Sequence, residues 1–457
     1  MQQPLRLRRA VPTPRTWPLA SRDVLAVVLF IGALIVGMWV RHGGLNQLTS
    51  LGGYFTALGQ VTALLGTYAA LIGLVLMSRS PWLEQLFGMD QLVGWHRWVG
   101  FATLWLLVGH TVFTTLGYAA AAGSGIMDEA WSLLATYPYV LMATVGLVLL
   151  VAVGFASVRA ARRRLSYETW YGIHLYAYLA IALAFAHELA VGTDLSNDRV
   201  AQVFWIALYV VVIALIVVFR VGQPIQMYLR HRFRVANVVH EGAGVVSIYV
   251  AGRDLDRLPV RAGQFFVWRF LTNGGWWRAH PFSLSAAPNG QYLRLTVKDS
   301  GNDSRILQRI GIGTRVFAEG PYGAFTSARR RKARILLIAG GIGVTPLRAL
   351  LEEMPPAAGA VTLLYRASSW DDVVFRDELD SLARTRGATI HYLVGRRSSS
   401  TLAMDPLDAR SVRQLVPDVH QRDVFVCGPD QMMEDVRRSL RALGVPNAQI
   451  HAERFAF

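Results

Sequence analysis

The chain has 457 residues, of which 53% are hydrophobic and only 17% charged, and its formal net charge is +16. This composition is too apolar for a soluble protein, and this length is too great for a single domain. The only cysteine, Cys427, excludes an intramolecular disulfide framework and favours a reducing compartment for the segment that carries it.

Most of the apolar residues lie in the first half of the chain. They form six runs of about 20 residues, the length that an α-helix needs to cross the hydrocarbon core of a bilayer. The predicted membrane spans lie near residues 24–40, 54–77, 93–118, 137–158, 169–187 and 201–219.

The positive charge comes almost entirely from arginine, because Lys298 and Lys332 are the only lysines. Arginines gather before the first span and between the fourth and fifth spans, whereas the loops on the other side contain few. The positive-inside rule therefore predicts a multi-pass protein of the cell membrane, with residues 1–22 and everything after the sixth span in the cytoplasm. This placement indicates a lipid bilayer as partner and argues against nucleic acid.

Four of the eleven histidines lie inside predicted spans, His96 and His110 in the third and His174 and His187 in the fifth. Polar groups at membrane depth are costly and tend to be functional. A separation of 14 residues covers about 21 Å and returns nearly to the same helix face, whereas 13 residues fall about 140° away from it. A helix irregularity, a tilt or different ring orientations would have to absorb that offset.

Because the third and fifth spans run in the same direction, His96 is level with His174, and His110 with His187. Two imidazoles on opposite sides of an iron porphyrin make a six-coordinate b-type haem, so the four histidines are predicted metal ligands for two haems. Zinc or copper would require three or four ligands at one level, and the sequence offers no third histidine or cysteine there. Four isolated, hydrogen-bonded histidines are the plainer alternative.

The second half of the chain changes pattern. Short alternating runs from 233 to about 325 predict a small antiparallel β-barrel, and strand–helix alternation from about 334 predicts an α/β fold with a mainly parallel sheet. We therefore expect a six-span domain over 23–222, a barrel domain over 223–327 and an α/β domain over 328–457.

Five motifs stand out in these two domains. The barrel contains RAHPFSLSAAP (278–288), VKDSGNDS (297–304) and EGPYGAF (319–325), and the α/β domain contains IAGGIGVTP (338–346) and VFVCGPDQMM (424–433). Each alone fits an ordinary strand and turn. Glycines between a strand and a helix, however, allow backbone N–H groups to approach a pyrophosphate.

In this order the motifs resemble the ferredoxin–NADP reductase superfamily. Joined to a membrane domain that carries paired histidines, they resemble the ferric reductase/NADPH oxidase family over residues 50–457. The resemblance implies that the barrel binds FAD. The residues that match its flavin sites are His280, Pro281, Phe282, Ser283, Lys298, Gly301 and Ser304. Ser283 would approach flavin N5, and the last three would contact the FAD pyrophosphate.

The resemblance also implies a nicotinamide-nucleotide site in the α/β domain. The matching residues are Gly340, Gly341, Gly343, Thr345 and Pro346 in the turn, and Cys427, Gly428 and Pro429 beside the nicotinamide. Phe457 resembles the terminal aromatic residue that stacks on the flavin, and Glu453 resembles a C-terminal acid. The predicted catalytic residues are accordingly Ser283, Cys427 and Phe457.

Arg366 directly follows the second strand of the α/β domain. An acid at this place would favour the ribose hydroxyls, whereas an arginine favours the 2′-phosphate of NADPH. Arg396 and Arg397 could assist, although ordinary surface arginines remain the alternative.

Together these features predict a transmembrane oxidoreductase that moves electrons from cytoplasmic NADPH through FAD and two haems to an acceptor outside. Oxygen and ferric chelates are equally expected acceptors, and the exterior residues Arg41, His42 and Arg199 would favour an anion. The alternatives are a cytochrome b-like protein that delivers electrons to a quinone or a partner protein, and a transporter with incidental histidines. Because the sequence contains no EF-hand loop, we expect activity without a protein activator.

Overall fold

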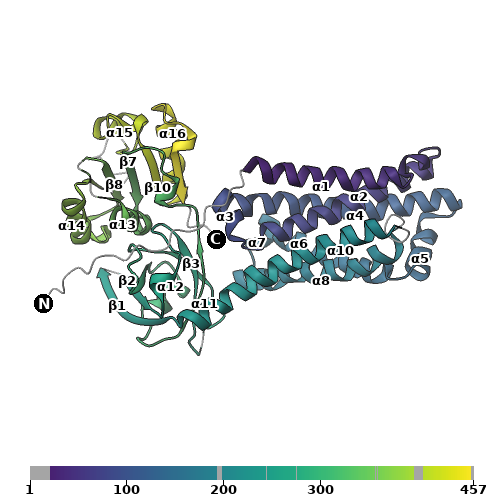
Figure 1. The fold of residues 1–457 in the computed structure, drawn as a ribbon, viewed down its shortest axis with the longest axis horizontal. Helices are drawn as coiled ribbons and strands as arrows, with labels where there is room; N and C mark the ends of the chain where they lie inside the picture. The colour runs from purple at the N-terminus through teal and green to yellow at the C-terminus, as the bar shows by residue number, and fades with distance from the viewer. Residues whose placement is uncertain are drawn as a thin grey trace. The chain divides into compact units, whose positions relative to one another are not determined.

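The computed structural model describes residues 21–192, 198–242, 244–273, 275–355, 357, 359–395 and 405–453. The described residues divide into two compact units, with the boundary between Arg220 and Val221. The first is helical, and the second combines antiparallel sheets with an α/β sheet (Figure 1).

Six helices in the described part of the chain are long and apolar enough to cross a membrane, which confirms the predicted multi-pass architecture. The first five are α1 (Ser21–Arg41), α2 (Leu51–Leu76), α4 (Met89–Ala122), α6 (Val140–Ser157) and α8 (Tyr167–Val191), and the sixth begins with α10 (Arg199–Leu215). The sixth continues through a π-helical segment, Ile216–Gly222, into α11 (Gln223–His231). Short helices α3 (Pro81–Phe87), α5 (Ile126–Thr136) and α7 (Arg159–Arg162) lie in the connections.

The outer surface of this helical unit is apolar. Phe30, Trp98 and Phe155 each expose about 70% of their surface, at 68%, 73% and 73%. Side chains of this size avoid water unless lipid or protein covers them. The bundle surface is therefore suited to contact with hydrocarbon.

Helix α2 packs closely against α4 along a row of glycines. Gly52, Gly59, Gly66 and Gly73 recur every seven residues, and all four face α4. A Cβ atom at Gly59 would lie 2.5 Å from Oγ1 of Thr114, and one at Gly66 would lie 2.8 Å from Leu107. Small residues at this spacing allow two membrane helices to approach closely. Such packing matters inside a bilayer, because no hydrophobic effect drives helices together there.

The predicted barrel consists of two three-stranded antiparallel sheets, β1-β2-β5 and β4-β3-β6. Their strands are β1 (Arg234–Gly242), β2 (Val245–Ala251), β3 (Phe265–Phe270), β4 (His280–Ser283), β5 (Tyr292–Lys298) and β6 (Val316–Tyr322). Alternating side chains such as Ile248, Phe266 and Leu295 fill the space between the sheets and are fully buried. Helix α12 (Asn302–Leu307) follows β5.

The last part of the chain forms a five-stranded parallel sheet in the order β11-β10-β7-β8-β9, as the α/β pattern predicted. The strands are β7 (Ile335–Gly340), β8 (Val361–Ala367), β9 (Thr389–Val394), β10 (Asp423–Cys427) and β11 (Ile450–Glu453). Helices α13 (Val344–Glu353), α14 (Arg376–Arg386), α15 (Ala409–Leu415) and α16 (Asp430–Ala442) connect them.

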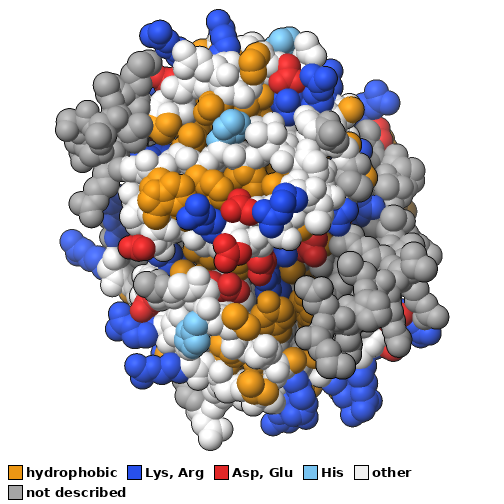
Figure 2. Space-filling model, turned by 90° about the vertical axis from the view of Figure 1, so that its left-hand side faces the viewer, with side chains coloured by type: hydrophobic (Ala, Val, Ile, Leu, Met, Phe, Trp, Pro, Cys, Tyr) orange, Lys and Arg blue, Asp and Glu red, His pale blue; other side chains and the backbone are white. Residues whose placement is uncertain are grey.

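Acidic and basic side chains are interspersed on the face of the molecule shown in Figure 2, which the sheet-containing unit forms. Mixed charge of this kind is typical of a surface in contact with water. It contrasts with the apolar exterior of the helical unit.

Candidate functional site

Each of the two histidine pairs predicted from the sequence comes together in the helical unit. The ring centroids of His96 and His174 are 5.9 Å apart, with 71° between the ring planes. The centroids of His110 and His187 are 6.4 Å apart, with an angle of 47°. Helices α4 and α8 therefore face each other at two levels.

These separations fit one iron ion between each pair of rings. Metal–nitrogen bonds of about 2.0 Å place two opposite nitrogens about 4 Å apart, and their ring centroids about 6 Å apart. No group of three or more His, Cys, Asp or Glu side chains that could hold a metal ion occurs among the described residues. The geometry thus suits two ligands per metal, as in a haem with two axial histidines.

Backbone carbonyls of α2 orient the two histidines of α4. Nδ1 of His96 lies 3.1 Å from the carbonyl oxygen of Gly73, and Nδ1 of His110 lies 3.0 Å from that of Gly59. A carbonyl oxygen only accepts, so Nδ1 carries the proton and Nε2 retains its lone pair. This is the tautomer that a metal requires.

The histidines of α8 are held differently. Nδ1 of His174 and Nδ1 of His187 are buried, and neither has a partner with hydrogen-bond geometry among the described residues, although the backbone of Pro138 approaches His187. The ring of Trp170 stacks on His174 at 5.0 Å, and Arg162 lies over that tryptophan at 4.7 Å. Aromatic packing thus fixes the His174 ring.

The 13-residue spacing on α8 needs no break in the helix, because α8 is continuous from Tyr167 to Val191. Since the offset on an ideal helix is about 140°, the two rings leave α8 in different directions to reach His96 and His110. Of the three ways to absorb the offset, a helix irregularity is thereby excluded.

Sequence reasoning missed Gly59 and Gly73. Their separation equals that of His96 and His110, and both belong to the seven-residue glycine row of α2. That repeated spacing was the signal available in the sequence. What it could not show was which carbonyl would meet which ring.

In the other unit, a cavity of about 640 Å³ lies at the carboxyl ends of β7, β8 and β10. This is the usual place for a ligand in an open parallel sheet. The predicted nucleotide residues that line the cavity are Gly340, Gly341, Gly343, Arg366, Gly428 and Pro429. Thr345 and Pro346 lie instead inside α13, where they are buried.

Gly343 permits the turn to pass very close to β10. A Cβ atom there would lie 2.3 Å from the carbonyl oxygen of Cys427 and 2.8 Å from the nitrogen of Gly428. The Cys427 side chain is fully buried and does not line the cavity. Burial, and secondarily the nearby Glu453 carboxylate, raises the pKa of the Cys427 thiol well above its usual range.

Two basic side chains reach the same cavity. Arg366 donates from Nη1 to the carbonyl oxygens of Ala367, at 2.7 Å, and Leu393, at 2.8 Å, which holds its guanidinium in place. Lys298 comes from β5 of the barrel and pairs with Asp372 at 3.1 Å. The hydrogen bond from Lys298 is the main reason why the pKa of Asp372 is lowered.

The predicted flavin motif lies on β4, which pairs with β3. The rings of His280 and Phe282 stack at 6.3 Å, and Ser283 is buried at the end of the strand. His280 also lines a small hollow together with Arg278 and with residues of α12.

Gly301 and Ser304 form the turn that begins α12. The Ser304 hydroxyl donates to the Gly301 carbonyl oxygen at 2.9 Å and accepts from the backbone N–H of Ser300 at 2.8 Å. Arg396, Arg397 and Phe457 lie outside the described residues, so their predicted roles remain predictions.

Of the residues predicted to face the exterior, Arg41 and His42 both pair with Asp198. The hydrogen bond from His42, with those from the backbone and the charge of Arg41, lowers the pKa of Asp198 to about 2. One carboxylate thus offsets part of the positive charge that the sequence suggested for attracting an anion.

Comparison with known proteins assigns both units. Residues 62–185 match the family described as the ferric reductase like transmembrane component, and residues 337–438 match the oxidoreductase NAD-binding domain. The chain belongs to the ferric reductase/NADPH oxidase family. The first match includes His96, His110 and His174 and ends two residues before His187.

The dehydrogenase half of this ferric reductase family member has relatives among soluble reductases. Ferredoxin–NADP reductase B of Sorangium cellulosum is 32% identical over 191 residues, which are 38% of this chain and 77% of that protein. Flavohemoprotein of Pseudomonas aeruginosa is 31% identical over 233 residues, 49% of this chain. The chain spans only 58% of that flavohemoprotein.

Among solved structures, the flavohem-like FAD/NAD binding domain of nitric oxide dioxygenase from Vibrio cholerae is similar at 24% identity and a TM-score of 0.39. The match covers 49% of this chain and 98% of that domain. The family match and the curated relatives identify the protein as an NAD(P)H-dependent oxidoreductase of the membrane and support binding of FAD and NAD(P)H.

Proposed function

We propose that this ferric reductase family member carries electrons from cytoplasmic NADPH, through FAD and two b haems, to an acceptor on the opposite face of the membrane. The observation that carries the proposal is the meeting of four histidines in two pairs, at 5.9 and 6.4 Å. A transporter or a structural bundle gives no reason for this arrangement.

His96 and His174 would hold the inner haem, and His110 and His187 the outer one. The carbonyls of Gly73 and Gly59 fix the protons on Nδ1 of His96 and His110, which leaves their Nε2 atoms to bind iron. When bound, FAD accepts the hydride of NADPH and releases single electrons, which the two haems conduct across the hydrocarbon layer.

In the other unit, the cavity beside Gly340, Gly341 and Gly343 would bind the nucleotide, with Arg366 as the contact to a 2′-phosphate. His280, Phe282 and Ser283 would contact FAD. We assign the haem domain to residues 23–222, the FAD domain to 223–327 and the nucleotide domain to 328–457, with both dehydrogenase domains cytoplasmic. Arginine-rich loops on one side support that orientation.

Two histidines per iron leave no axial position for an acceptor, so reduction would occur at the edge of the outer haem. Oxygen would then give superoxide, and a ferric chelate would give ferrous iron. Both acceptors need only access to that edge.

The first test is spectroscopic. Membranes that contain the protein, reduced with dithionite, should show b-type haem bands, with two haems per chain. Their absence would exclude the proposal.

The second test compares NADPH-driven superoxide formation in air with reduction of a ferric chelate under argon. If both are slow while the haems are reduced, a quinone or a partner protein becomes the acceptor to examine.

A further inference from the structure

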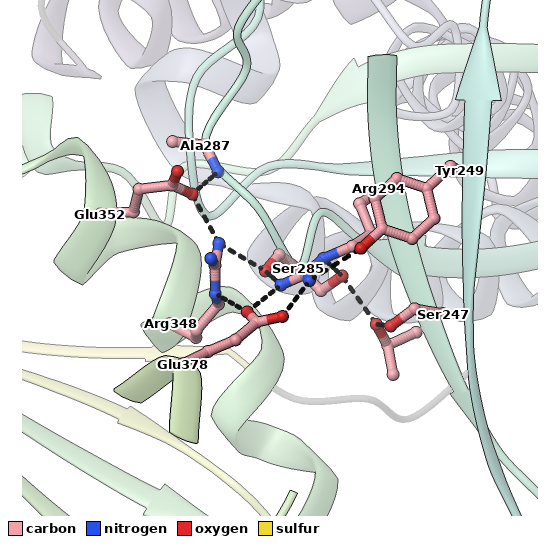
Figure 3. A network of polar contacts seen from close by, with 9 residues as sticks. Ser247, Tyr249, Ser285, Ala287, Arg294, Arg348, Glu352 and Glu378 are labelled. Carbon is pink, nitrogen blue, oxygen red and sulfur yellow. Dashed lines mark hydrogen bonds and ion pairs between the residues drawn. The ribbon is translucent and has the colours of Figure 1, made fainter. Parts of the chain in front are cut away.

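A network of charged side chains, in which the arginines are buried and the glutamates partly exposed, connects the β-barrel to the α/β domain within one unit (Figure 3). Its centre is Arg294 on β5, which binds both carboxylate oxygens of Glu378 on α14, at 2.8 and 3.0 Å. Arg348 on α13 approaches the same carboxylate, with Nε 2.8 Å from Oε2. One acid of the α/β domain thus pairs with an arginine from each domain.

Both arginines bind Ser285, in the segment that follows strand β4 and the predicted flavin motif. Arg294 donates to the carbonyl oxygen of Ser285 at 2.8 Å and to its hydroxyl at 3.1 Å. Arg348 donates to the same carbonyl oxygen at 3.2 Å. Ser285 lies two residues after Ser283, so the network fixes the backbone directly beyond the predicted flavin contact.

Two further carboxylates tie the end of α13 to the barrel. Glu352 accepts from the backbone N–H of Ala287 at 2.7 Å and from Arg348 at 2.5 Å. Glu353 accepts from the backbone N–H of Ala262 at 2.8 Å. Side chains of helix α13 are therefore bonded to the barrel backbone at Ala262, Ser285 and Ala287.

The network contains two arginines, Arg294 and Arg348, and two glutamates, Glu352 and Glu378, so their formal charges cancel. Burial opposes the charge of Arg294, but its bonds to Glu378 raise its pKa above the usual value. Burial would raise the pKa of Glu378, but Arg294 and Arg348 lower it overall. Arg294 and Glu378 therefore stay charged at neutral pH.

Ion pairs with a buried arginine seldom stabilise a fold more than apolar side chains would. Adhesion between the domains has another source, because Ala262, Ala287 and Phe325 of the barrel pack into the core of the α/β domain. The directional bonds of the network instead fix the position of the α/β domain relative to the barrel, because interfaces between domains otherwise allow motion.

Helix α13 connects this network to the nucleotide cavity. The helix is preceded by its N-cap residue Gly343, which lines the cavity, and Arg348 follows five residues after Gly343, about 7.5 Å along the helix axis. Helix α13 and its hydrogen bonds therefore join the glycine turn of the nucleotide cavity to the segment that follows the predicted flavin motif.

We propose that Arg294, Arg348, Glu352 and Glu378 are positioning residues that set the approach of the dihydronicotinamide to the flavin. The inference rests on the proposed function of the two domains. In the step concerned, a hydride, which is one proton with two electrons, leaves the nicotinamide ring of NADPH and is accepted by FAD, giving NADP⁺ and the two-electron-reduced flavin. A displacement of about 1 Å at such a step can lower its rate about 100-fold.

The test is anaerobic stopped-flow reduction of the flavin by NADPH in the full-length, FAD- and haem-loaded protein. Glu378→Gln and Glu352→Gln should each lower the reduction rate at saturating NADPH about 10- to 100-fold. The NADPH concentration for half-maximal rate should change less than about threefold, because the nucleotide cavity is left intact. The kinetic isotope effect with NADPH deuterated at C4 should increase as hydride transfer becomes slower.

Asp377→Asn is the matched control, because Asp377 is exposed and precedes Glu378 on the same helix. It should reduce at the wild-type rate, and Glu378→Asp should recover part of the loss. FAD content and dithionite reduction of the haems should be the same in all variants, since neither depends on the nucleotide domain's position.

If Glu378→Gln does not fold, Glu352→Gln decides, because it leaves the Arg294–Glu378 pair intact. Wild-type reduction rates in the folded variants, or a loss explained entirely by missing FAD, would overturn the inference. If NADPH fails to reduce the flavin of the wild-type protein, the proposed function fails instead.

Discussion

Nδ1 of His110 lies 3.0 Å from the carbonyl oxygen of Gly59, a residue on a helix that contributes no metal ligand. His96 has the same relationship to Gly73, at 3.1 Å. Helix α2 therefore selects the tautomer of both histidines on α4. It would support both proposed haem sites at once, and partners that hold a metal-binding histidine in this way affect metal affinity strongly.

Replacing one histidine should remove one haem. His110→Ala deletes one of only two ligands at the outer level, so the haem content should fall from two per chain to one, with the inner haem retained. His96→Ala should give the converse. The haem content per chain, with potentiometric titration to tell the two haems apart, is the measurement. His391→Ala, in the nucleotide domain, is the control, and retention of both haems in His110→Ala would refute the ligand assignment.

The glycine row makes a paired prediction. A Cβ atom at Gly59 would lie 2.5 Å from Oγ1 and 3.0 Å from the backbone nitrogen of Thr114, so Gly59→Ala must displace α4 beside His110. Such overpacking costs about 1–3 kcal/mol. Gly73→Ala meets its nearest atom, Nδ1 of His96, at 3.7 Å, an ordinary contact.

We therefore expect Gly59→Ala to weaken or lose the outer haem and Gly73→Ala to retain both. Haem spectra of the two purified variants test the difference. Equal retention in both would show that the close approach of α2 to α4 does not hold the outer site.

The nucleotide turn should be intolerant of a side chain at Gly343. Its Cβ atom would lie 2.3 Å from the carbonyl oxygen of Cys427, and a backbone atom cannot move aside without opening the sheet. Gly343→Ala should lower the thermal midpoint and weaken NADPH binding more than tenfold. Gly444 differs from Gly343 in having a left-handed φ of +76°, but no atom lies within 4 Å of its added Cβ, so Gly444→Ala should show only backbone strain of about 1 kcal/mol.

Arg366 should determine the preference for NADPH. Charge-assisted hydrogen bonds contribute about 1.5–3 kcal/mol, so Arg366→Ala should lower kcat/KM for NADPH about 10- to 100-fold. The value for NADH should change less than about threefold. Arg376→Ala removes an arginine that lies over Trp370, outside the cavity lining, and serves as control. An equal loss with both nucleotides would contradict recognition of the 2′-phosphate.

The charge of Glu378 gives a pH dependence with a definite sign. Burial alone would raise the pKa of Glu378, but the opposite effect of Arg294 and Arg348 is larger. The pKa in the folded protein therefore lies below the unfolded value of about 4.3. Its contribution to the free energy of unfolding is thus complete above about pH 4.3 and is lost as the pH falls through the folded pKa.

Consequently, the difference in thermal midpoint between wild type and Glu378→Gln should be constant from pH 8 to about pH 5 and should narrow below about pH 4. Thermal denaturation in detergent across this range is the measurement. Asp377→Asn should show no such narrowing, and a constant difference down to pH 3.5 would contradict the charged state of Glu378.

Hydropathy and motif order were sufficient to predict the six spans, the antiparallel sheets and the parallel sheet. The histidine pairs were also predictable, because parallel spans with nearly equal spacing must align at two levels. Short elements such as α15 and β11 were not predicted. Seven and four residues are too few for a helical or alternating pattern to stand out.

The remaining features depend on contacts between distant segments. Arg294, Arg348 and Glu378 lie on a strand and two helices, and nothing in their local sequence indicates that they meet. Cys427 matches a motif beside the nicotinamide, but sequence does not reveal that its side chain points into the core while Gly428 and Pro429 line the cavity.

The shared 14-residue spacing on α2 and α4 also restricts how such proteins can diverge. One inserted residue in either helix would turn everything beyond it by about 100° and separate a carbonyl from its ring. A gain or loss of seven residues, about 10.5 Å, would restore the match to within about 20°, but only if α8 changed together with α2 and α4. The gap between the two metal levels can therefore change only in large steps, so length variation among descendants of this chain should be confined to the loops.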